Sequence, residues 1–210
     1  RILKTKISGD GRWIVTGGED YAARLLDRNS GQPPQLFAEG LTRLAAVDIS
    51  KDGHWVVAGR RDGGVLLRNL SEAGADRTLT GLSDPAISLE FSADSRLLAM
   101  GCRDGSVAIL DLTESDAALQ FSPHRHDGMV RDLQFVKGDR LASFGGRQAV
   151  HWEYRSKTLP RVFRGDGSLA TTAASLSGRW LAAGGWDTHV RLWDRQSKSD
   201  VPFILEGHSG

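Results

Sequence analysis

Short segments in which every second residue is apolar recur along the chain, and polar turns separate them. Such segments cover residues 44–50, 86–92 and 129–136, and second apolar segments lie at 13–15, 55–57, 97–99 and 180–182. The turns that join the two kinds of segment lie at 8–11, 50–53, 92–95 and 136–139. An alternation with a period of two is typical of half-buried strands, and no helical period accompanies it. The pattern predicts an all-β fold.

The predicted strands belong to an internal repeat. The segment LAAGGWDTHVRLWD, residues 181–194, ends in Trp193-Asp194. The matching pairs elsewhere are Leu26-Asp27, Arg68-Asn69, Leu110-Asp111 and Trp152-Glu153. Their second members stand at 27, 69, 111, 153 and 194, so the intervals are 42, 42, 42 and 41 residues. Repeats of this length are typical of solenoids and propellers.

Each repeat holds four predicted strands. A hairpin with Asp62-Gly63 or Asp104-Gly105 at its tip joins the second strand to the third, and these pairs favour a type I′ turn. Third strands lie at 65–70, 107–112 and 190–193, and weaker fourth segments at 35–38, 77–79, 118–121, 161–163 and 202–205. No linker divides the chain. We therefore predict one domain, 1–210, with units at about 1–40, 41–81, 82–125, 126–165 and 166–207.

On these residues the chain resembles the tryptophan–aspartate (WD) repeat family of β-propellers, which has units of about 40–45 residues and a Gly-His … Trp-Asp frame. The best copy of the frame is GGWDTHVRLWD at 184–194, and Gly207-His208 matches the opening of a further unit. The resemblance covers essentially the whole chain. It implies five four-stranded propeller blades.

The resemblance also implies a network of a His, a hairpin Asp, a Ser or Thr and a Trp in each blade. The structural residues at the Asp and Trp places are Asp20, Asp62, Asp104, Asp187, Trp152 and Trp193. Gly146 replaces the Asp of the fourth unit, and the Ser or Thr survives only at Thr16 and Ser143. His126 is the one internal histidine at the expected place, and no unit holds all four residues. Repeats this degenerate resemble arrays in large bacterial multidomain proteins, where they are sensor or docking regions.

Five units leave two arrangements open. They can close as a five-bladed ring, or they can form consecutive blades of a larger ring, most often seven in the family. We favour the larger ring, because the terminal cuts fall between blades and no shared strand locks the ends together. Blade five packed directly on blade one would contradict this interpretation.

Composition narrows the range of partners. The chain of 210 residues carries 27 basic and 26 acidic side chains, a net charge of +1, which argues against nucleic acid as the main partner. No apolar run approaches the ~20 residues of a membrane span, and one cysteine, Cys102, gives no internal disulfide. The cluster 124–127, His-Arg-His-Asp, lies where the family places Gly-His, and no other ligand completes a metal site. We expect no metal, no cofactor and a cytoplasmic location.

The resemblance places partner binding at the narrow end of the propeller, on the hairpin position before the Asp and on the positions flanking the start of each first strand. Trp186 is the least standard of these residues. The predicted partner-binding residues are Arg43, Arg61, Arg103, Met129, Arg131 and Trp186. Arginine and tryptophan anchor interfaces, and clustered arginines suit an acidic or phosphorylated peptide.

We therefore predict a non-catalytic protein-interaction scaffold whose partners are proteins or peptides, other domains of its own parent chain included. The alternative is an enzyme or a small-ligand-binding propeller with its site in the central channel. That alternative needs Asp48, Glu90 and Asp132 of the first strands to point into the channel.

Overall fold

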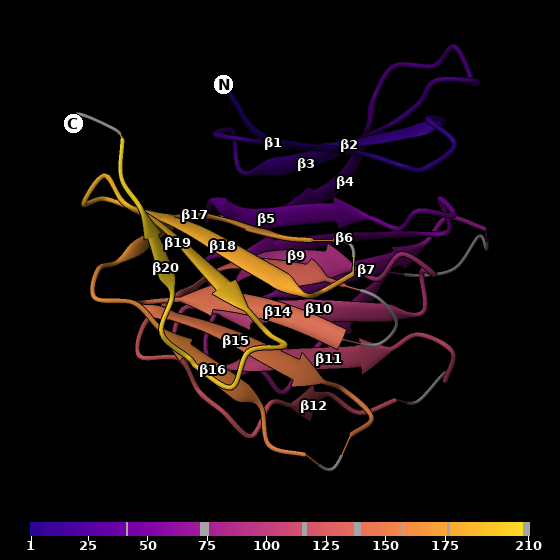
Figure 1. Ribbon diagram of the computed structural model, residues 1–210. Coiled ribbons are helices and arrows are strands. Elements are labelled where there is room, and N and C mark those ends of the chain that lie inside the picture. The colour runs from indigo at the N-terminus through magenta and orange to yellow at the C-terminus, as the bar shows by residue number, and fades with distance from the viewer. Residues whose placement is uncertain are drawn as a thin grey trace.

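The computed structural model describes residues 1–40, 42–71, 76–114, 117–136, 140–156, 158–175 and 177–207. These residues form five four-stranded antiparallel sheets, which we call blades 1 to 5, and the predicted all-β propeller is confirmed (Figure 1). The described part of the chain contains no helix that could cross a membrane. Two elements of the predicted repeat, residues 137–139 of the fourth turn and His208, lie outside the described residues.

The strands follow chain order within every blade. Blade 1 holds β1 (Ile2–Ile7), β2 (Trp13–Gly18), β3 (Ala22–Asp27) and β4 (Gln35–Glu39). Blade 2 holds β5 (Leu44–Ile49), β6 (Trp55–Arg60), β7 (Val65–Asn69) and β8 (Arg77–Leu79). Blade 3 holds β9 (Ala86–Phe91), β10 (Leu97–Cys102), β11 (Val107–Asp111) and β12 (Gln120–Phe121). Blade 4 holds β13 (Val130–Phe135), β14 (Arg140–Gly145), β15 (Gln148–Glu153) and β16 (Arg161–Arg164). Blade 5 holds β17 (Leu169–Ala174), β18 (Trp180–Gly185), β19 (Val190–Asp194) and β20 (Phe203–Leu205).

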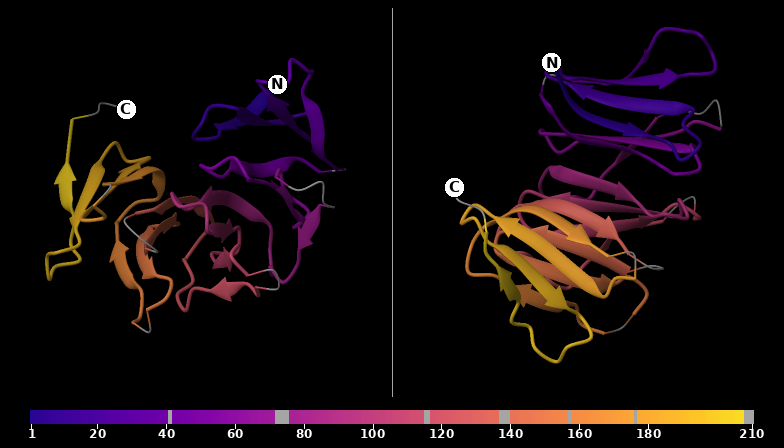
Figure 2. Two further views of the ribbon diagram at one scale, coloured as in Figure 1. Left: turned by 90° about the vertical axis from the view of Figure 1, so that its right-hand side faces the viewer. Right: turned by 45° about the horizontal axis from the view of Figure 1, so that its top comes forward.

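The first strand of each blade is its innermost strand, because β1, β5, β9, β13 and β17 contact one another in that order. The blades form an arc, and blades 1 and 5 stand apart at its two ends (Figure 2). Blade 5 therefore does not pack on blade 1, which is the arrangement that would have contradicted a larger ring. The total number of blades stays a prediction.

The core lies between the blades rather than within them. Separate apolar clusters join blades 1 and 2, blades 2 and 3, blades 3 and 4, and blades 4 and 5. The inner strands of a middle blade contribute alternate residues to the clusters with the blade before it and the blade after it, since successive side chains point to opposite faces of a sheet. A middle blade is thus covered on both faces, and every residue of β10 and β11 is buried.

The prediction of a type I′ turn in the hairpins is wrong. Gly63 N–H donates to the Arg60 carbonyl at 3.1 Å, and Arg60 N–H donates to the Gly64 carbonyl at 2.8 Å. Only the glycine of the Asp62-Gly63 pair has a positive φ, 97°, whereas a type I′ turn needs two such residues. The loop is one residue longer than a two-residue turn, so the aspartate lies inside an ordinary β-turn and the glycine closes it from the left-handed region.

Candidate functional site

A hollow of about 400 Å³ opens where the inner strands of blades 1 to 4 begin. We call it the basic hollow, because four cationic side chains line it and no carboxylate does. Its lining residues are Lys4, Ala45, Arg61, Pro85, Ile87, Arg103, Met129 and Arg131. Four of the six predicted partner-binding residues, Arg61, Arg103, Met129 and Arg131, are thereby brought together.

β-Bulges at the start of β5, β9 and β13 aim side chains into the basic hollow. The register shifts between Leu44 and Ala46 in β5 and between Val130 and Asp132 in β13. The extra residues at these bulges, Ala45 and Arg131, both line the hollow. A bulge re-aims a side chain in this way, so the strand presents a residue that regular alternation would turn aside.

The loops of the same end are held by backbone hydrogen bonds. Arg61 N–H donates to the Arg43 carbonyl at 3.0 Å, and Arg103 N–H donates to the Pro85 carbonyl at 3.0 Å. Each hairpin is thus tied to the segment that leads into the first strand of its own blade. The arginine side chains project from a fixed backbone, which reduces the ordering cost of binding.

The charge of the basic hollow is largely uncompensated. Arg103 pairs with Asp84 at 2.9 Å. No hydrogen bond or ion pair engages the side chains of Lys4, Arg61 or Arg131 within the described part of the chain. Three cations therefore face the hollow without a protein counter-ion, and a ligand with negative charge can supply one.

The other two predicted partner-binding residues lie outside the basic hollow. Trp186 is 83% exposed in the hairpin of blade 5, and its N–H makes the equivalent backbone contact, with the Ser168 carbonyl at 3.4 Å. Blade 5 is at the end of the arc (Figure 2), and Trp186 is not among the residues that line the hollow. Arg43 is exposed but does not line the hollow either.

The hairpin aspartates bond to local partners that differ between blades. Asp20 pairs with Arg24 at 2.5 Å, and Asp62 accepts the Gly64 N–H at 3.0 Å. Burial alone would raise the pKa of Asp104, but hydrogen bonds from Ser106 and Ser83 and the charge of Arg125 lower it to about 2. Asp187 pairs with Arg191, which holds its pKa well below the usual range.

The two tryptophans predicted as structural lie in the core. Trp152 is buried between blades 3 and 4, and Trp193 is buried between blades 4 and 5 beside Phe163. In blade 4, His126 Nε2 lies 2.8 Å from Ser143 Oγ, so the histidine and the serine of the family network meet there. Burial lowers the pKa of His126 to about 4, which keeps the ring neutral.

The sequence pattern does not predict the roles of three charged residues. Asp127 accepts the Arg147 N–H at 3.1 Å, so it serves the blade 4 hairpin whose own aspartate is replaced by Gly146. Arg191 is fully buried and bridges Asp187 and Asp166. Lys4 completes the basic hollow. None of the three residues stands out from the repeat pattern in the sequence. The position of Asp127 directly after His126 could have indicated its contact with the blade 4 hairpin.

The inner-strand carboxylates connect neighbouring blades. Asp48 is buried, pairs with Lys6 of β1 at 3.2 Å and accepts the Phe91 N–H of β9 at 2.8 Å. Glu90 pairs with the same lysine at 3.3 Å. Asp132 accepts hydrogen bonds from Leu133 N–H and from the Thr172 hydroxyl of β17. All three carboxylates therefore take part in contacts between blades.

The histidine cluster at 124–127 is divided between separate partners. His124 Nε2 lies 3.1 Å from Gln148 Oε1, whereas His126 faces Ser143. In the described ranges, no group of three or more histidine, cysteine or carboxylate side chains is arranged so that it could hold a metal ion. Cys102 is buried and unpaired, and burial raises the pKa of its thiol to about 11.

Comparisons with known proteins bear on the repeat and the fold. The family described as WD domain, G-beta repeat matches residues 75–111 and 157–194. A chain in a crystal structure of a mitotic checkpoint complex is similar over 99% of this chain and 65% of that chain, with a TM-score of 0.78 and 20% sequence identity. This chain therefore spans somewhat less than two thirds of that relative's length. No curated protein matches the sequence.

Proposed function

We propose that the chain is a non-catalytic binding module that takes an acidic peptide segment in the basic hollow. Two of its segments match the WD repeat and its fold is a β-propeller, and propellers of this kind generally serve as scaffolds for protein interactions. The observation that carries the proposal is the group of Lys4, Arg61 and Arg131, three cations that share one hollow and whose side chains have no partner among the described residues. Arginine forks bind carboxylates in two-point geometry, and the apolar floor of Ala45, Pro85 and Ile87 can pack against peptide side chains.

The dimensions of the basic hollow also favour a peptide segment. About 400 Å³ is enough for a few side chains, and small-molecule sites of this size are usually lined mainly by apolar groups. Here half of the lining residues are cationic. We propose that partners include other domains of the same parent chain and that the protein acts in the cytoplasm.

The test is a fluorescence-anisotropy titration with a short glutamate-rich peptide. Arg61→Glu/Arg131→Glu should weaken binding by about tenfold or more, because it reverses two uncompensated charges of the hollow. The matched control is Lys51→Glu/Arg96→Glu, which makes the same change of net charge on exposed turns between first and second strands, at the opposite end of the blades.

The control separates a site from a net-charge effect. If both double variants lose binding equally, the peptide responds only to total charge and the site is wrong. If the unmodified protein shows no salt-dependent binding, the acidic partner is wrong.

A further inference from the structure

A second group of arginines lies at the opposite end of blades 4 and 5, where the turns between first and second strands are found. A cavity of about 260 Å³ opens there, and we call it the arginine cavity. Its lining residues are Arg140, Ser177, Arg179, Arg195 and Gln196. The basic hollow lies at the hairpin end of the blades, so the two sites share no residue.

Arg195 is the unusual member of the arginine cavity. It directly follows β19, and the residues at the same place in blades 2, 3 and 4 are Leu70, Leu112 and Tyr154. Those three side chains pack on the apolar clusters between their own blade and the preceding one. Blade 5 thus places a guanidinium where three other blades place an apolar contact.

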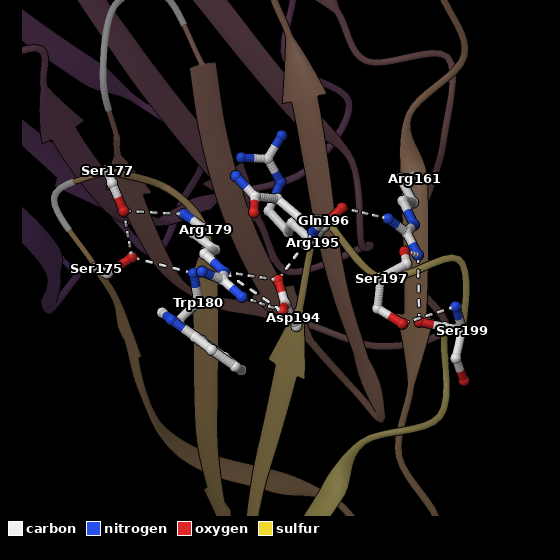
Figure 3. A network of polar contacts seen from close by, with 10 residues as sticks. All are labelled: Arg161, Ser175, Ser177, Arg179, Trp180, Asp194, Arg195, Gln196, Ser197 and Ser199. Atoms are coloured by element: carbon white, nitrogen blue, oxygen red, sulfur yellow. Dashed lines mark hydrogen bonds and ion pairs between the residues drawn. The ribbon is translucent and has the colours of Figure 1, made fainter.

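The neighbours of Arg195 already have carboxylate partners of their own. Arg140 pairs with Glu153 at 2.9 Å, Arg179 with Asp194 at 2.8 Å and Arg161 with Asp200 at 2.8 Å. Figure 3 shows Arg179 held against Asp194 and Arg161 held against the loop after β19. Arg195 forms no ion pair with a described residue, and its Nη1 donates only to the Gly178 carbonyl.

The charge of Arg195 is also poorly solvated. Its Nε is buried and lacks a hydrogen-bond partner among the described residues. Burial and the nearby charge of Arg140 lower the pKa of Arg195, although Glu153 opposes them. A partly buried cation that faces other cations is unfavourable unless an anion approaches it.

We infer that the arginine cavity binds a tetrahedral oxyanion of the phosphate class, with Arg195 as its counter-ion. Guanidinium groups match phosphate oxygens in geometry and charge. Ser177 and Gln196 place a hydroxyl and an amide at the same cavity. The phosphate group can belong to a free anion or to a phosphorylated side chain, since the cavity is open to solvent.

Blade 1 supplies a matched control for Arg195. Arg28 directly follows β3, and its Nη1 donates to the Gly11 carbonyl at 2.8 Å, which is the equivalent contact. Arg28 is exposed, and no blade precedes blade 1 in the arc to place further arginines beside it. Replacement of Arg28 therefore repeats the chemical change without the cavity.

The experiment is calorimetric titration of the whole chain with inorganic phosphate, with chloride at matched ionic strength as reference. The unmodified protein should bind one phosphate, Arg195→Leu should weaken binding by about tenfold or more, and Arg28→Leu should bind as the unmodified protein does. Arg195→Gln serves as a second variant that keeps a polar side chain. A parallel titration with a capped phosphoserine peptide identifies the source, because tighter binding of the peptide assigns a phosphorylated side chain and tighter binding of phosphate assigns a free anion.

Two results would overturn the inference. One is phosphate binding no stronger than chloride binding, and the other is unchanged binding in both Arg195 variants. The double variant Arg61→Glu/Arg131→Glu must retain phosphate binding, since a loss there would place the anion in the basic hollow instead.

Discussion

Blades 3 and 5 both contain a segment that matches the WD repeat, yet they contact their preceding blades in different ways. At the contact between blades 2 and 3, Leu67 and Ala108 belong to one apolar cluster, and Leu112 packs against it. Between blades 4 and 5, the equivalent places hold His151, Arg191 and Arg195. The same backbone register thus carries an apolar contact in one case and a charged or titratable contact in the other.

The difference shows that agreement with the repeat motif does not measure how a blade is stabilised. Blade 5 has the best copy of the motif, but its β18 is only partly buried, whereas every residue of β10 in blade 3 is buried. Blade 3 lies between two blades, and blade 5 packs on one within this arc. Position in the arc and the residues at the contact therefore determine local stability.

The largest expected effect on the free energy of unfolding comes from matched core substitutions in blades 3 and 5. Leu98 and Leu181 occupy equivalent places and are both fully buried. Leu98→Ala should cost about 3–5 kcal/mol of unfolding free energy, and Leu181→Ala about 2–3 kcal/mol, because blade 5 can relax around the cavity. Urea unfolding followed by tryptophan fluorescence measures both. An equal or greater cost for Leu181→Ala would remove the distinction between the two contacts.

The equivalent positions in the blades could be predicted from the sequence, but the burial of the side chains at those positions could not. The spacing of 42 residues places equivalent positions in every blade, and that register brought Arg61, Arg103 and Arg131 to one hollow. The same register cannot tell that Arg24 is exposed while Arg191, at the equivalent place, is fully buried. Burial depends on the blade that packs against each arginine, and a local pattern does not contain that information.

Hydrogen-bond partners are unpredictable for a similar reason. The sequence shows that Gly146 replaces a hairpin aspartate, but not that the Asp127 carboxylate reaches the same hairpin from a loop. It also predicts two positive φ values at Asp62-Gly63, whereas the three-residue loop requires only one. Both outcomes depend on loop length and on which segments lie side by side in the fold, and the turn preferences of single residues do not contain that information.

An intermediate effect should appear at mildly acidic pH at the contact between blades 4 and 5. Burial and the charges of Arg195, Arg140 and Arg161 lower the pKa of His151 to about 3. Because this ring is neutral when folded and binds a proton near pH 6.5 when unfolded, its contribution is complete above pH 6.5 and is lost as pH falls toward 3. One proton changes stability by at most about 1.4 kcal/mol per pH unit.

His151→Leu restores the residue type that blade 2 carries at Leu67, so it should flatten the pH dependence of the urea midpoint between pH 6.5 and 4. His126 stays in place in this variant and still contributes its own slope, since its pKa is lowered to about 4. The informative quantity is therefore the difference in pH slope between the unmodified protein and His151→Leu. Identical slopes would mean that His151 is protonated in the folded state, and the contact would then differ from blades 2 and 3 only in packing.

The smallest expected effect tests whether the two blades also differ in their turns. Ser92 Oγ accepts the Leu97 N–H at 2.9 Å in a buried turn of blade 3, and Ser175 Oγ accepts the Trp180 N–H at 3.0 Å in a more open turn of blade 5. Ser92→Ala should cost about 1–3 kcal/mol, because the Leu97 N–H is left buried without an acceptor. Ser175→Ala should cost less than about 1 kcal/mol, since water can replace the hydroxyl. Thermal unfolding of both variants measures the ratio, and equal costs would show that the turns are equivalent and that the contrast between the blades arises only where they pack.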